Sequence, residues 1–279
     1  MELKPAHSLT LEELAALFNL AFTDYVGGNV HFTGSTLARF LARDNVDLDL
    51  SQIILADGQP VGFGYIERLG WSSRLAAFGI VPAASGMGLG KEAMTRLIAQ
   101  ARARGDHQFE LEVIEQNTRG VRLYEGVGFQ RLRRLVGYDG KPAVLNPEMQ
   151  RSIPNLESLD IPAVAQLIMQ HGAADLPWQL AGISLARHSP PDVAYRLDQA
   201  YIVISNPEAQ TIAIRALLVP TEQRRQGHAT RLLAALFAHY PDKHWVVSAV
   251  CPEEIGAELF AHFGFERQPI SQFQMRLKL

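Results

Sequence analysis

The sequence predicts an α/β (α+β) protein built from two tandem copies of one domain. A glycine loop between a strand and a helix occurs twice, with Gly88 and Gly227 139 positions apart. A Gly-Phe pair after a short helix also occurs twice, with Gly128 and Gly264 136 positions apart. Strand and helix periodicities follow one another in a similar order around both loops. The length of 279 residues suits two domains of roughly 140 residues each.

The first copy is expected to begin with a helix that follows a capping box. The Thr10 hydroxyl can accept the Glu13 N–H while the Glu13 side chain reaches back to the cap. Strand and helix patterns then alternate along the copy. They predict a short helix over 35–42, strands over 51–56 and 61–66 joined at Asp57-Gly58, a strand over 74–81, a helix from the loop to Gly105, a strand over 109–114 and a helix over 119–127.

The second copy is expected after an irregular segment rich in proline, glycine and asparagine. We predict a first domain over 1–140, a linker over 141–157 and a second domain over 158–279. Within the second domain the patterns predict helices over 160–170 and 254–263, strands over 201–205, 211–219 and 245–250, and a helix after the second loop.

The composition is that of a soluble globular protein, with 47% hydrophobic and 20% charged residues. The net charge of −3 provides no overall field that attracts nucleic acid or an anionic membrane. Cys251 is the single cysteine, so no disulfide can form within one chain, and the N-terminus has no signal pattern. These features predict a cytoplasmic protein without a nucleic-acid or membrane partner, and the scattered histidines predict no metal site.

Both glycine loops suit a pyrophosphate group. The first turn of a helix has unpaired N–H groups and a partial positive charge, and glycine lets a phosphate approach closely. The spacing Gly86-x-Gly88-x-Gly90 differs from the dinucleotide pattern G-x-G-x-x-G, and Gly90-Lys91-Glu92 lacks the hydroxyl of a P-loop. The remaining interpretation is an acetyl-CoA loop of the form Gln/Arg-x-x-Gly-x-Gly/Ala.

Three motifs in a fixed order carry a resemblance to a known family. They are the loops Ser85-Gly86-Met87-Gly88-Leu89-Gly90 and Arg224-Arg225-Gln226-Gly227-His228-Ala229, the strand Leu111-Glu112-Val113 with Asn117, and the run Leu123-Tyr124-Glu125-Gly126-Val127-Gly128-Phe129. Over nearly its whole length the chain resembles the GNAT family of N-acetyltransferases, near the branch that acetylates ribosomal proteins. The resemblance implies two GNAT-like domains, each a mixed, mostly antiparallel sheet flanked by helices.

The resemblance also implies acetyl-CoA as co-substrate and residues that bind it. In copy one Phe78, Gly79 and Ile80 would present backbone groups to the pantetheine arm, and Asn117 would bond near it. The amides of the Gly86 to Gly90 loop would hold the pyrophosphate, and Tyr124 would face the thioester. Copy one has Ser85 where the family usually has Arg or Gln. Copy two has Arg224 there, and its loop is a possible second CoA site.

Acetyl transfer to an amine requires an acid for the leaving thiolate and, for a lysine-like acceptor, a base. By resemblance, Tyr124 is the acid and Glu112 is the base, directly or through water. Strand alternation places Glu112 and Glu110 on the face opposite Leu111 and Val113, which makes Glu110 the substitute base. The alternatives are a packing role for Tyr124 and a solvated or salt-bridged role for Glu112.

Copy two lacks both proton-transfer groups. Adding 136 positions gives Ser248 for Glu112 and Phe260 for Tyr124. We therefore predict that copy one is catalytic and that copy two is degenerate. The alternative for the whole chain is a non-catalytic acyl-CoA-binding regulator.

The acceptor is expected to be a small-molecule or peptide amine. Asp24, Tyr25 and His31 follow the first helix, where the family commonly lines its acceptor site. A protein N-terminus, a lysine, a polyamine, an amino acid and an antibiotic all remain open as acceptors. The sequence does not indicate an oligomeric state.

Overall fold

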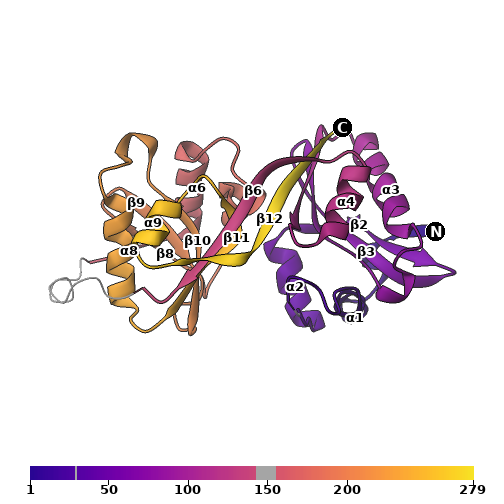
Figure 1. Cartoon of the computed structure of the whole chain (residues 1–279), viewed down its shortest axis with the longest axis horizontal. Helices are drawn as coiled ribbons and strands as arrows, with labels where there is room; N and C mark the ends of the chain where they lie inside the picture. The colour runs from indigo at the N-terminus through magenta and orange to yellow at the C-terminus, as the bar shows by residue number, and fades with distance from the viewer. Residues whose placement is uncertain (29, 143–154) are drawn as a thin grey trace. The chain divides into compact units, whose positions relative to one another are not determined.

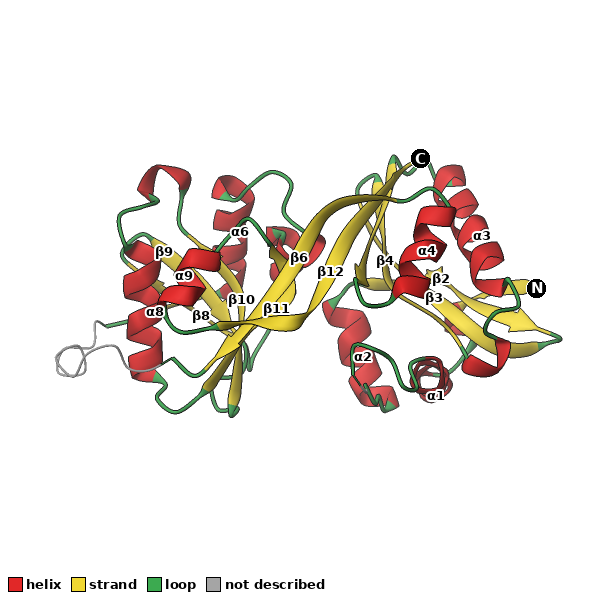
Figure 2. Ribbon diagram, viewed as in Figure 1, coloured by secondary structure: helices red, strands yellow, loops and turns green. Residues whose placement is uncertain are grey.

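A computed structural model describes residues 1–28, 30–142 and 155–279, which form two compact units (Figure 1). Unit 1 comprises Met1–Arg134 and Gln272–Leu279, and unit 2 comprises Leu135–Ser271. In each unit helices pack against a sheet (Figure 2), which confirms the predicted fold class. The linker expected over 141–157 lies mostly outside the described residues.

The sheet of unit 1 has the strand order β1-β2-β3-β4-β5-β12. Only β4 and β5 pair in parallel, so the sheet is mixed and mostly antiparallel. Its strands are β1 Glu2–Pro5, β2 Val46–Ala56, β3 Gln59–Leu69, β4 Ser72–Ile80, β5 Gln108–Ile114 and β12 Glu266–Lys278. Its helices are α1 Leu11–Ala21, α2 Gly34–Arg43, α3 Leu89–Ala103 and α4 Thr118–Gly126, with 3-10 turns at Ala6–Ser8 and Pro82–Ala84.

Local chemistry fixes the ends of these elements as the sequence predicts. The capping box of α1 is present: the Thr10 N–H donates to Glu13 Oε2 at 2.8 Å, and the Glu13 N–H donates to Thr10 Oγ1 at 3.2 Å. Asp57 and Gly58 both have positive φ, as a tight turn between β2 and β3 requires.

Each face of the unit 1 sheet is covered by one pair of helices. One face packs on α1 and α2, where the Phe18 ring stacks on Phe63 at a centroid distance of 5.2 Å. The opposite face packs on α3 and α4 through Met94, Leu97 and Leu111.

Unit 2 repeats this architecture with the strand order β6-β11-β10-β9-β8-β7. Among the residues of this unit that the structure describes, β10 and β11 are the one parallel pair. The strands are β6 Gln130–Gly140, β7 Glu157–Leu159, β8 Val193–Leu197, β9 Ala200–Ile204, β10 Thr211–Leu218 and β11 His244–Pro252. The helices are α6 Ile161–His171, α7 Gly182–Leu185, α8 His228–His239 and α9 Ala257–His262, with 3-10 turns at Trp178–Leu180 and Thr221–Gln223.

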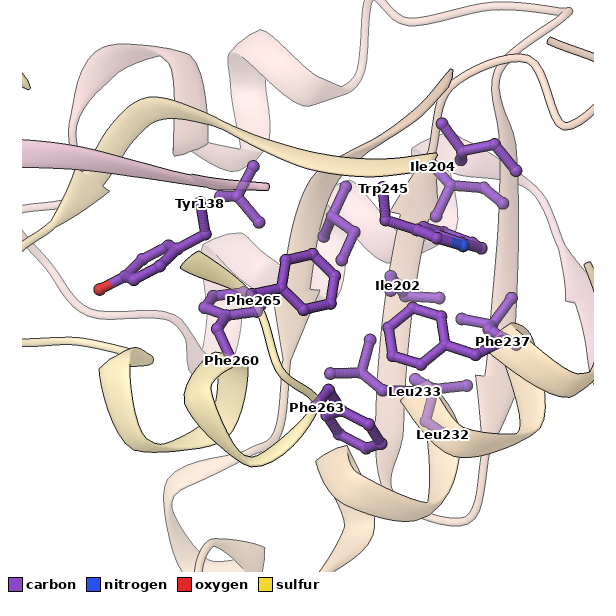
Figure 3. Close-up of a cluster of buried hydrophobic side chains, with 14 of the residues drawn as sticks. Tyr138, Ile202, Ile204, Leu232, Leu233, Phe237, Trp245, Phe260, Phe263 and Phe265 are labelled. Carbon is purple, nitrogen blue, oxygen red and sulfur yellow. The ribbon is translucent and has the colours of Figure 1, made fainter. Parts of the chain in front are cut away.

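Aromatic side chains form the larger core of unit 2 (Figure 3). The Phe237 ring meets Trp245 edge to face at 4.9 Å and Phe263 at 5.1 Å. Phe260 stacks on Tyr138 at 4.9 Å. No helix among the described residues is both long and apolar enough to cross a membrane.

Each unit contains a strand segment from outside the sequence range predicted for its domain. The predicted domains over 1–140 and 158–279 differ from the observed units in this respect. Gln272–Lys278 of β12 pair with β5 and belong to unit 1, where Met275 is fully buried. Residues 135–140 of β6 pair with β11 and belong to unit 2. Each sheet is therefore completed by chain from beyond its own predicted segment (Figure 1).

Candidate functional site

The site of unit 1 lies where its two parallel strands separate. Pairing between β4 and β5 ends at Leu75 and Leu111. Ala76 is the next residue of β4, and it is an extra residue in a β-bulge, because Leu75 pairs with Ile66 and Ala77 with Tyr65. Bulges of this kind end pairing and redirect side chains, often beside active sites. The predicted pantetheine-binding residues, Phe78, Gly79 and Ile80, follow the bulge.

The glycine loop follows β4 and leads directly into α3. Gly86 and Gly88 have φ values of +87° and +82°, and both are exposed. No side chain caps α3, so the N–H groups of its first turn are available to an anion. A Cβ at Gly90 would contact Phe78 and Ile80 at 3.8 Å, so loop and strand lie against each other. Met87 is exposed at the tip, and Ser85 and Leu89 are half-buried.

The side chain of Arg119, which the sequence analysis did not predict as a site residue, lies beside this loop. Arg119 Nη2 is 3.9 Å from the position that a Gly86 Cβ would take. Arg119 comes from the start of α4, 34 positions after Ser85, and its side chain is exposed. A guanidinium from α4 thus lies next to the loop that lacks its own Arg or Gln.

Tyr124, Tyr25 and Asn117 form one group at the end of β5. Tyr124 is 8% exposed, and burial raises its pKa, with a smaller contribution in the same direction from Tyr25. Burial also raises the pKa of Tyr25, partly offset by a side-chain hydrogen bond with Asn117. Asn117 Oδ1 accepts the Gly120 N–H at 3.0 Å and so caps α4. The structure therefore places a protonated phenol beside the predicted acceptor loop.

The remaining acceptor candidates lie in the same loop but outside this group. Asp24 and His31 have exposed side chains, and Asp24 has a φ of +55°. A Cβ at Gly27 would lie 2.7 Å from Ile114 Cδ1, so a small residue is needed where the loop covers the end of β5. Of the three candidates, the structure brings Tyr25 to the site.

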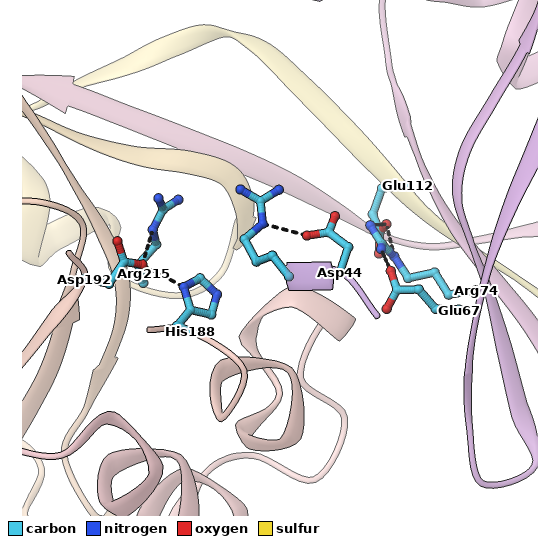
Figure 4. A network of polar contacts seen from close by, with 8 residues as sticks. Asp44, Glu67, Arg74, Glu112, His188, Asp192 and Arg215 are labelled. Atoms are coloured by element: carbon cyan, nitrogen blue, oxygen red, sulfur yellow. Dashed lines mark hydrogen bonds and ion pairs between the residues drawn. The ribbon is translucent and has the colours of Figure 1, made fainter. Parts of the chain in front are cut away.

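Glu112 is part of a buried ion-pair network with Arg74 and Glu67 (Figure 4). Arg74 Nε and Nη2 donate to Glu112 Oε2 at 2.8 and 2.7 Å, and Arg74 Nη1 donates to Glu67 Oε1. The side chains of Glu112 and Glu67 are each 3% exposed. Burial acts to lower the pKa of Arg74, but the two carboxylates outweigh it and raise that pKa, so the guanidinium stays charged. A base role for Glu112 must therefore operate from within an ion pair.

Glu67 is the titrating member of this network. Burial raises its pKa from 4.5 to about 7, although Arg74 acts in the opposite direction. We expect unit 1 to lose stability as the pH rises from about 4.5 to about 7, because the unfolded chain has released this proton while the folded chain still holds it. The loss is about 1.4 kcal/mol per pH unit and at most about 3.5 kcal/mol in total.

Glu67→Gln should remove that contribution, because the amide does not titrate. Hydrogen exchange of β3 amides at several pH values measures the local unfolding free energy of both proteins. Identical pH profiles for wild type and variant would contradict the prediction.

Glu110, the substitute base, is held by the C-terminal strand. Arg276 Nη2 lies 2.8 Å from Glu110 Oε1, and Gln274 Nε2 donates to Glu110 Oε2 at 3.2 Å. Gln108 Nε2 donates to Oε1 at 3.1 Å. The side chain is 6% exposed, so Glu110 links β5 to β12.

Unit 2 keeps the shape of the loop with different residues. Arg225 has a φ of +61°, although it is not a glycine, and Gly227 has a φ of +79°. These positions match Gly86 and Gly88 of unit 1. A non-glycine residue in this region costs about 1–2 kcal/mol, so the fold maintains the loop conformation against a local penalty. No side chain caps α8 either.

A pocket of about 950 Å³ lies within unit 2 beside this loop. It is lined along β10 by residues 214–219, on the loop by Arg224, Arg225, Gly227, His228 and Ala229, and on α9 by Phe260. Gln226 lies between these loop residues and donates from Nε2 to the Glu222 carbonyl at 3.3 Å. Phe260 packs in the core where unit 1 has Tyr124, and Ser248 is exposed.

Cys251 also lines the pocket. It is 8% exposed, and burial raises the pKa of its thiol to about 11, with Glu254 adding to the effect. The thiol therefore stays protonated near neutral pH. Within the described ranges, no group of three or more His, Cys, Asp or Glu side chains could hold a metal ion.

Comparison with known proteins finds a family match within unit 1. The model of the acetyltransferase (GNAT) family matches residues 14–129, which begin within α1 and end just after α4. Residues 14–129 therefore match a GNAT acetyltransferase domain. The matched segment contains the glycine loop, Glu112, Asn117 and Tyr124.

One curated relative and two solved structures are also similar to this chain. A mycothiol acetyltransferase of Stackebrandtia nassauensis is 33% identical over 132 residues, which span 44% of this chain and 42% of that protein. A GCN5-related N-acetyltransferase from Sphaerobacter thermophilus has a TM-score of 0.70 at 14% identity, covering 99% of this chain and 95% of the other. A tandem GNAT protein from the clavulanic acid biosynthesis pathway has a TM-score of 0.65 at 14% identity, with 99% and 98% covered. Both structures show the GNAT fold along the whole chain.

Proposed function

We propose that unit 1 transfers an acetyl group from acetyl-CoA to a primary amine by direct attack of the amine nitrogen on the thioester carbonyl carbon. The observation that carries this proposal is the buried phenol of Tyr124 in the same unit as an uncapped glycine loop. An acid and an anion cradle are the two fixed groups that this reaction needs.

The residues of unit 1 fit a bound acetyl-CoA, which supplies the activated acetyl thioester. The open space at Gly88 and the free N–H groups of α3 suit the pyrophosphate, and Arg119 adds a cation beside Gly86. The backbone of Phe78, Gly79 and Ile80 would bind the pantetheine arm along β4. Asn117 would fix the arm near Tyr124.

The proton transfers follow from the positions of Tyr124 and Glu112. The amine nitrogen forms a bond to the carbonyl carbon, the C–S bond breaks, and the thiolate takes the Tyr124 proton. Glu112 receives the proton lost by the amine, through water, because Arg74 and the buried position separate its carboxylate from a bulky acceptor. Such a relay is more important for a lysine-like amine, which costs roughly 4–5 kcal/mol to deprotonate near pH 7, than for an α-amine, which costs about 1 kcal/mol.

Unit 2 is proposed as a second CoA site without turnover. The loop conformation and the adjoining pocket of about 950 Å³ support binding, whereas Phe260 cannot donate a proton. The non-catalytic acyl-CoA-binding role, which the sequence left open for the whole chain, is here proposed for unit 2 alone. Unit 1 carries out catalysis.

The acceptor is proposed to be a small-molecule or peptide amine. The relative named a mycothiol acetyltransferase favours a small molecule, although it matches this chain over less than half of either length. We place the reaction in the cytoplasm, because the one cysteine of the chain is an unpaired, buried thiol.

Release of CoA from acetyl-CoA in the presence of an amine panel tests the proposal. The panel should contain α-amino acids, polyamines, amino sugars, aminoglycosides, and peptides with free N-termini or lysines. At least one class should give amine-dependent release and an acetylated product by mass spectrometry. Binding of acetyl-CoA without release for any class would favour the purely regulatory alternative.

Arg119→Ala is expected to raise the KM for acetyl-CoA about tenfold and to leave kcat almost unchanged. The guanidinium beside Gly86 would contact the pyrophosphate equally in the ground state and transition state, and a charge-assisted hydrogen bond contributes about 1.5–3 kcal/mol. Steady-state kinetics with varied acetyl-CoA measure the effect. Arg122→Ala, on the same helix, is the matched control. An unchanged KM in Arg119→Ala would remove Arg119 from the site.

A further inference from the structure

Arg215 occupies a β-bulge at the point where the strands of unit 2 separate. In β10, Ile214 pairs with Ile204 and Ala216 pairs with Val203, which leaves Arg215 as the extra residue. Parallel pairing between β10 and β11 ends just before it, at Ala213. A bulge redirects the side chain that it carries, so an arginine at this point is aimed by the backbone.

The counterpart of Arg215 in unit 1 is Ala76. Both are bulge residues of the strand that precedes the glycine loop. They lie 139 positions apart, the same separation as Gly88 and Gly227. The catalytic unit therefore has a methyl group where unit 2 has a guanidinium.

Arg215 lines one part of the pocket of unit 2, and the loop lines another. Leu218, the end of β10, lies three positions after Arg215, which is about 10 Å of extended strand. Next to the loop, His228 Nδ1 lies 2.8 Å from Arg231 Nη2 and 3.6 Å from Asp198 Oδ2, and its other ring nitrogen is Nε2. That buried Nε2 has no partner among the described residues, and His228 lines the pocket. Anion-binding groups thus lie near both Gly227 and Arg215.

The guanidinium of Arg215 forms an ion pair with Asp192 through its Nε. Its Nε lies 3.4 Å from Asp192 Oδ2, which also bonds His188 Nδ1 at 2.8 Å. Its terminal nitrogens point away from Asp192 and His188 (Figure 4). Arg215 Nε is buried and makes this ion pair without a hydrogen bond. The two terminal nitrogens of Arg215 carry the geometry with which arginine binds carboxylates. Glu254 is another charged residue that lines the pocket.

We propose that unit 2 binds a CoA thioester whose acyl group ends in a carboxylate, with that carboxylate on Arg215. The proposal rests on the second CoA site proposed for this unit. A CoA whose pyrophosphate lies on the Gly227 loop and whose pantetheine arm follows residues 217–219 has its acyl end at the bulge. A short acetyl group would leave the arginine without a ligand partner, whereas a dicarboxylic acyl group supplies one. Unit 1, with Ala76, has no such preference.

Calorimetric titration of the full chain with acetyl-CoA and succinyl-CoA tests the proposal. Gly88→Val is used as the background, so that binding reports on unit 2. Succinyl-CoA should bind at least tenfold more tightly than acetyl-CoA. Arg215→Ala should remove this difference, and Arg215→Gln, which keeps more of the packing, should do the same. Arg196→Ala, which removes an arginine outside the pocket, should retain it.

The outcomes distinguish the existence of the second CoA site from its preference for an acyl group that ends in a carboxylate. If neither thioester binds to the Gly88→Val protein, the second CoA site itself is absent and the inference falls with it. If both bind equally, or if Arg215→Ala and Arg215→Gln leave succinyl-CoA affinity unchanged, the site stands and the carboxylate preference is overturned. Thermal unfolding of each variant verifies that loss of affinity is not loss of the fold.

Discussion

Tyr124→Phe is expected to lower kcat by about 10²- to 10⁴-fold while acetyl-CoA affinity stays within about twofold. The substitution removes one hydroxyl and keeps the ring that packs beside Phe129 at 6.1 Å, so the fold should persist. Without that hydroxyl the thiolate has no positioned proton donor, and the acid contribution to the rate is lost. Initial rates of CoA release and calorimetric titration with acetyl-CoA measure the two effects.

The pH dependence provides a second measure of the same role. Burial raises the pKa of Tyr124 above its ordinary value of 10.0, so the phenol keeps its proton through the alkaline range. The kcat of the wild type should therefore not fall between about pH 8 and 10 through loss of this acid. Tyr138→Phe in unit 2 makes the same chemical change at a site without a proposed role and should leave kcat unchanged. Equal kcat values for wild type and Tyr124→Phe would remove Tyr124 as the acid.

Deletion of residues 272–279 is expected to unfold unit 1 and to leave unit 2 folded. The deletion removes the strand that pairs with β5 and takes Met275 out of the core against α3 and α4. Truncating one such buried methionine to alanine costs about 2–5 kcal/mol, and a typical domain is stable by only about 5–15 kcal/mol. It also exposes the edge of β5 and leaves Glu110 without Arg276.

Hydrogen exchange with mass spectrometry can report on each unit separately. In the deleted protein, amides of β3 to β5 should lose protection, whereas amides of β9 and β10 should keep it. Met275→Ala should reduce protection of the first set by an intermediate amount, and a synthetic 272–279 peptide should restore part of it. Full protection of β5 in the deleted protein would show that β12 is dispensable for unit 1.

The repeated motifs were sufficient to predict two GNAT-like copies and the elements that present the site. Strand alternation correctly placed Glu112 and Glu110 on one face of β5, and the loop positions follow from glycines whose φ must be positive. These features are local in sequence. A turn, a cap or an alternating strand carries its own signal within a few residues.

Partners that come from distant segments could not be predicted in this way. Arg74 reaches Glu112 across 38 positions because β4 and β5 are parallel neighbours, and Arg119 reaches the loop through the packing of α4. The β-bulge at Arg215 depends on how β10 pairs with β9, so the sequence of β10 alone does not predict it. The same holds for the bulge at its counterpart Ala76. β12 lies more than 150 positions from β5, so its pairing with that strand is visible only in the folded chain.

The pairing of β12 with β5 has a consequence for protein synthesis. A ribosome makes the N-terminal copy first, and domains generally begin to fold in that order. Here the sheet of that copy lacks its β12 segment until residues 272–278 have been translated, after the whole of unit 2. The first copy to be made is the last to be finished, so a nascent chain that stalls within the second copy carries an incomplete first copy with an open strand edge.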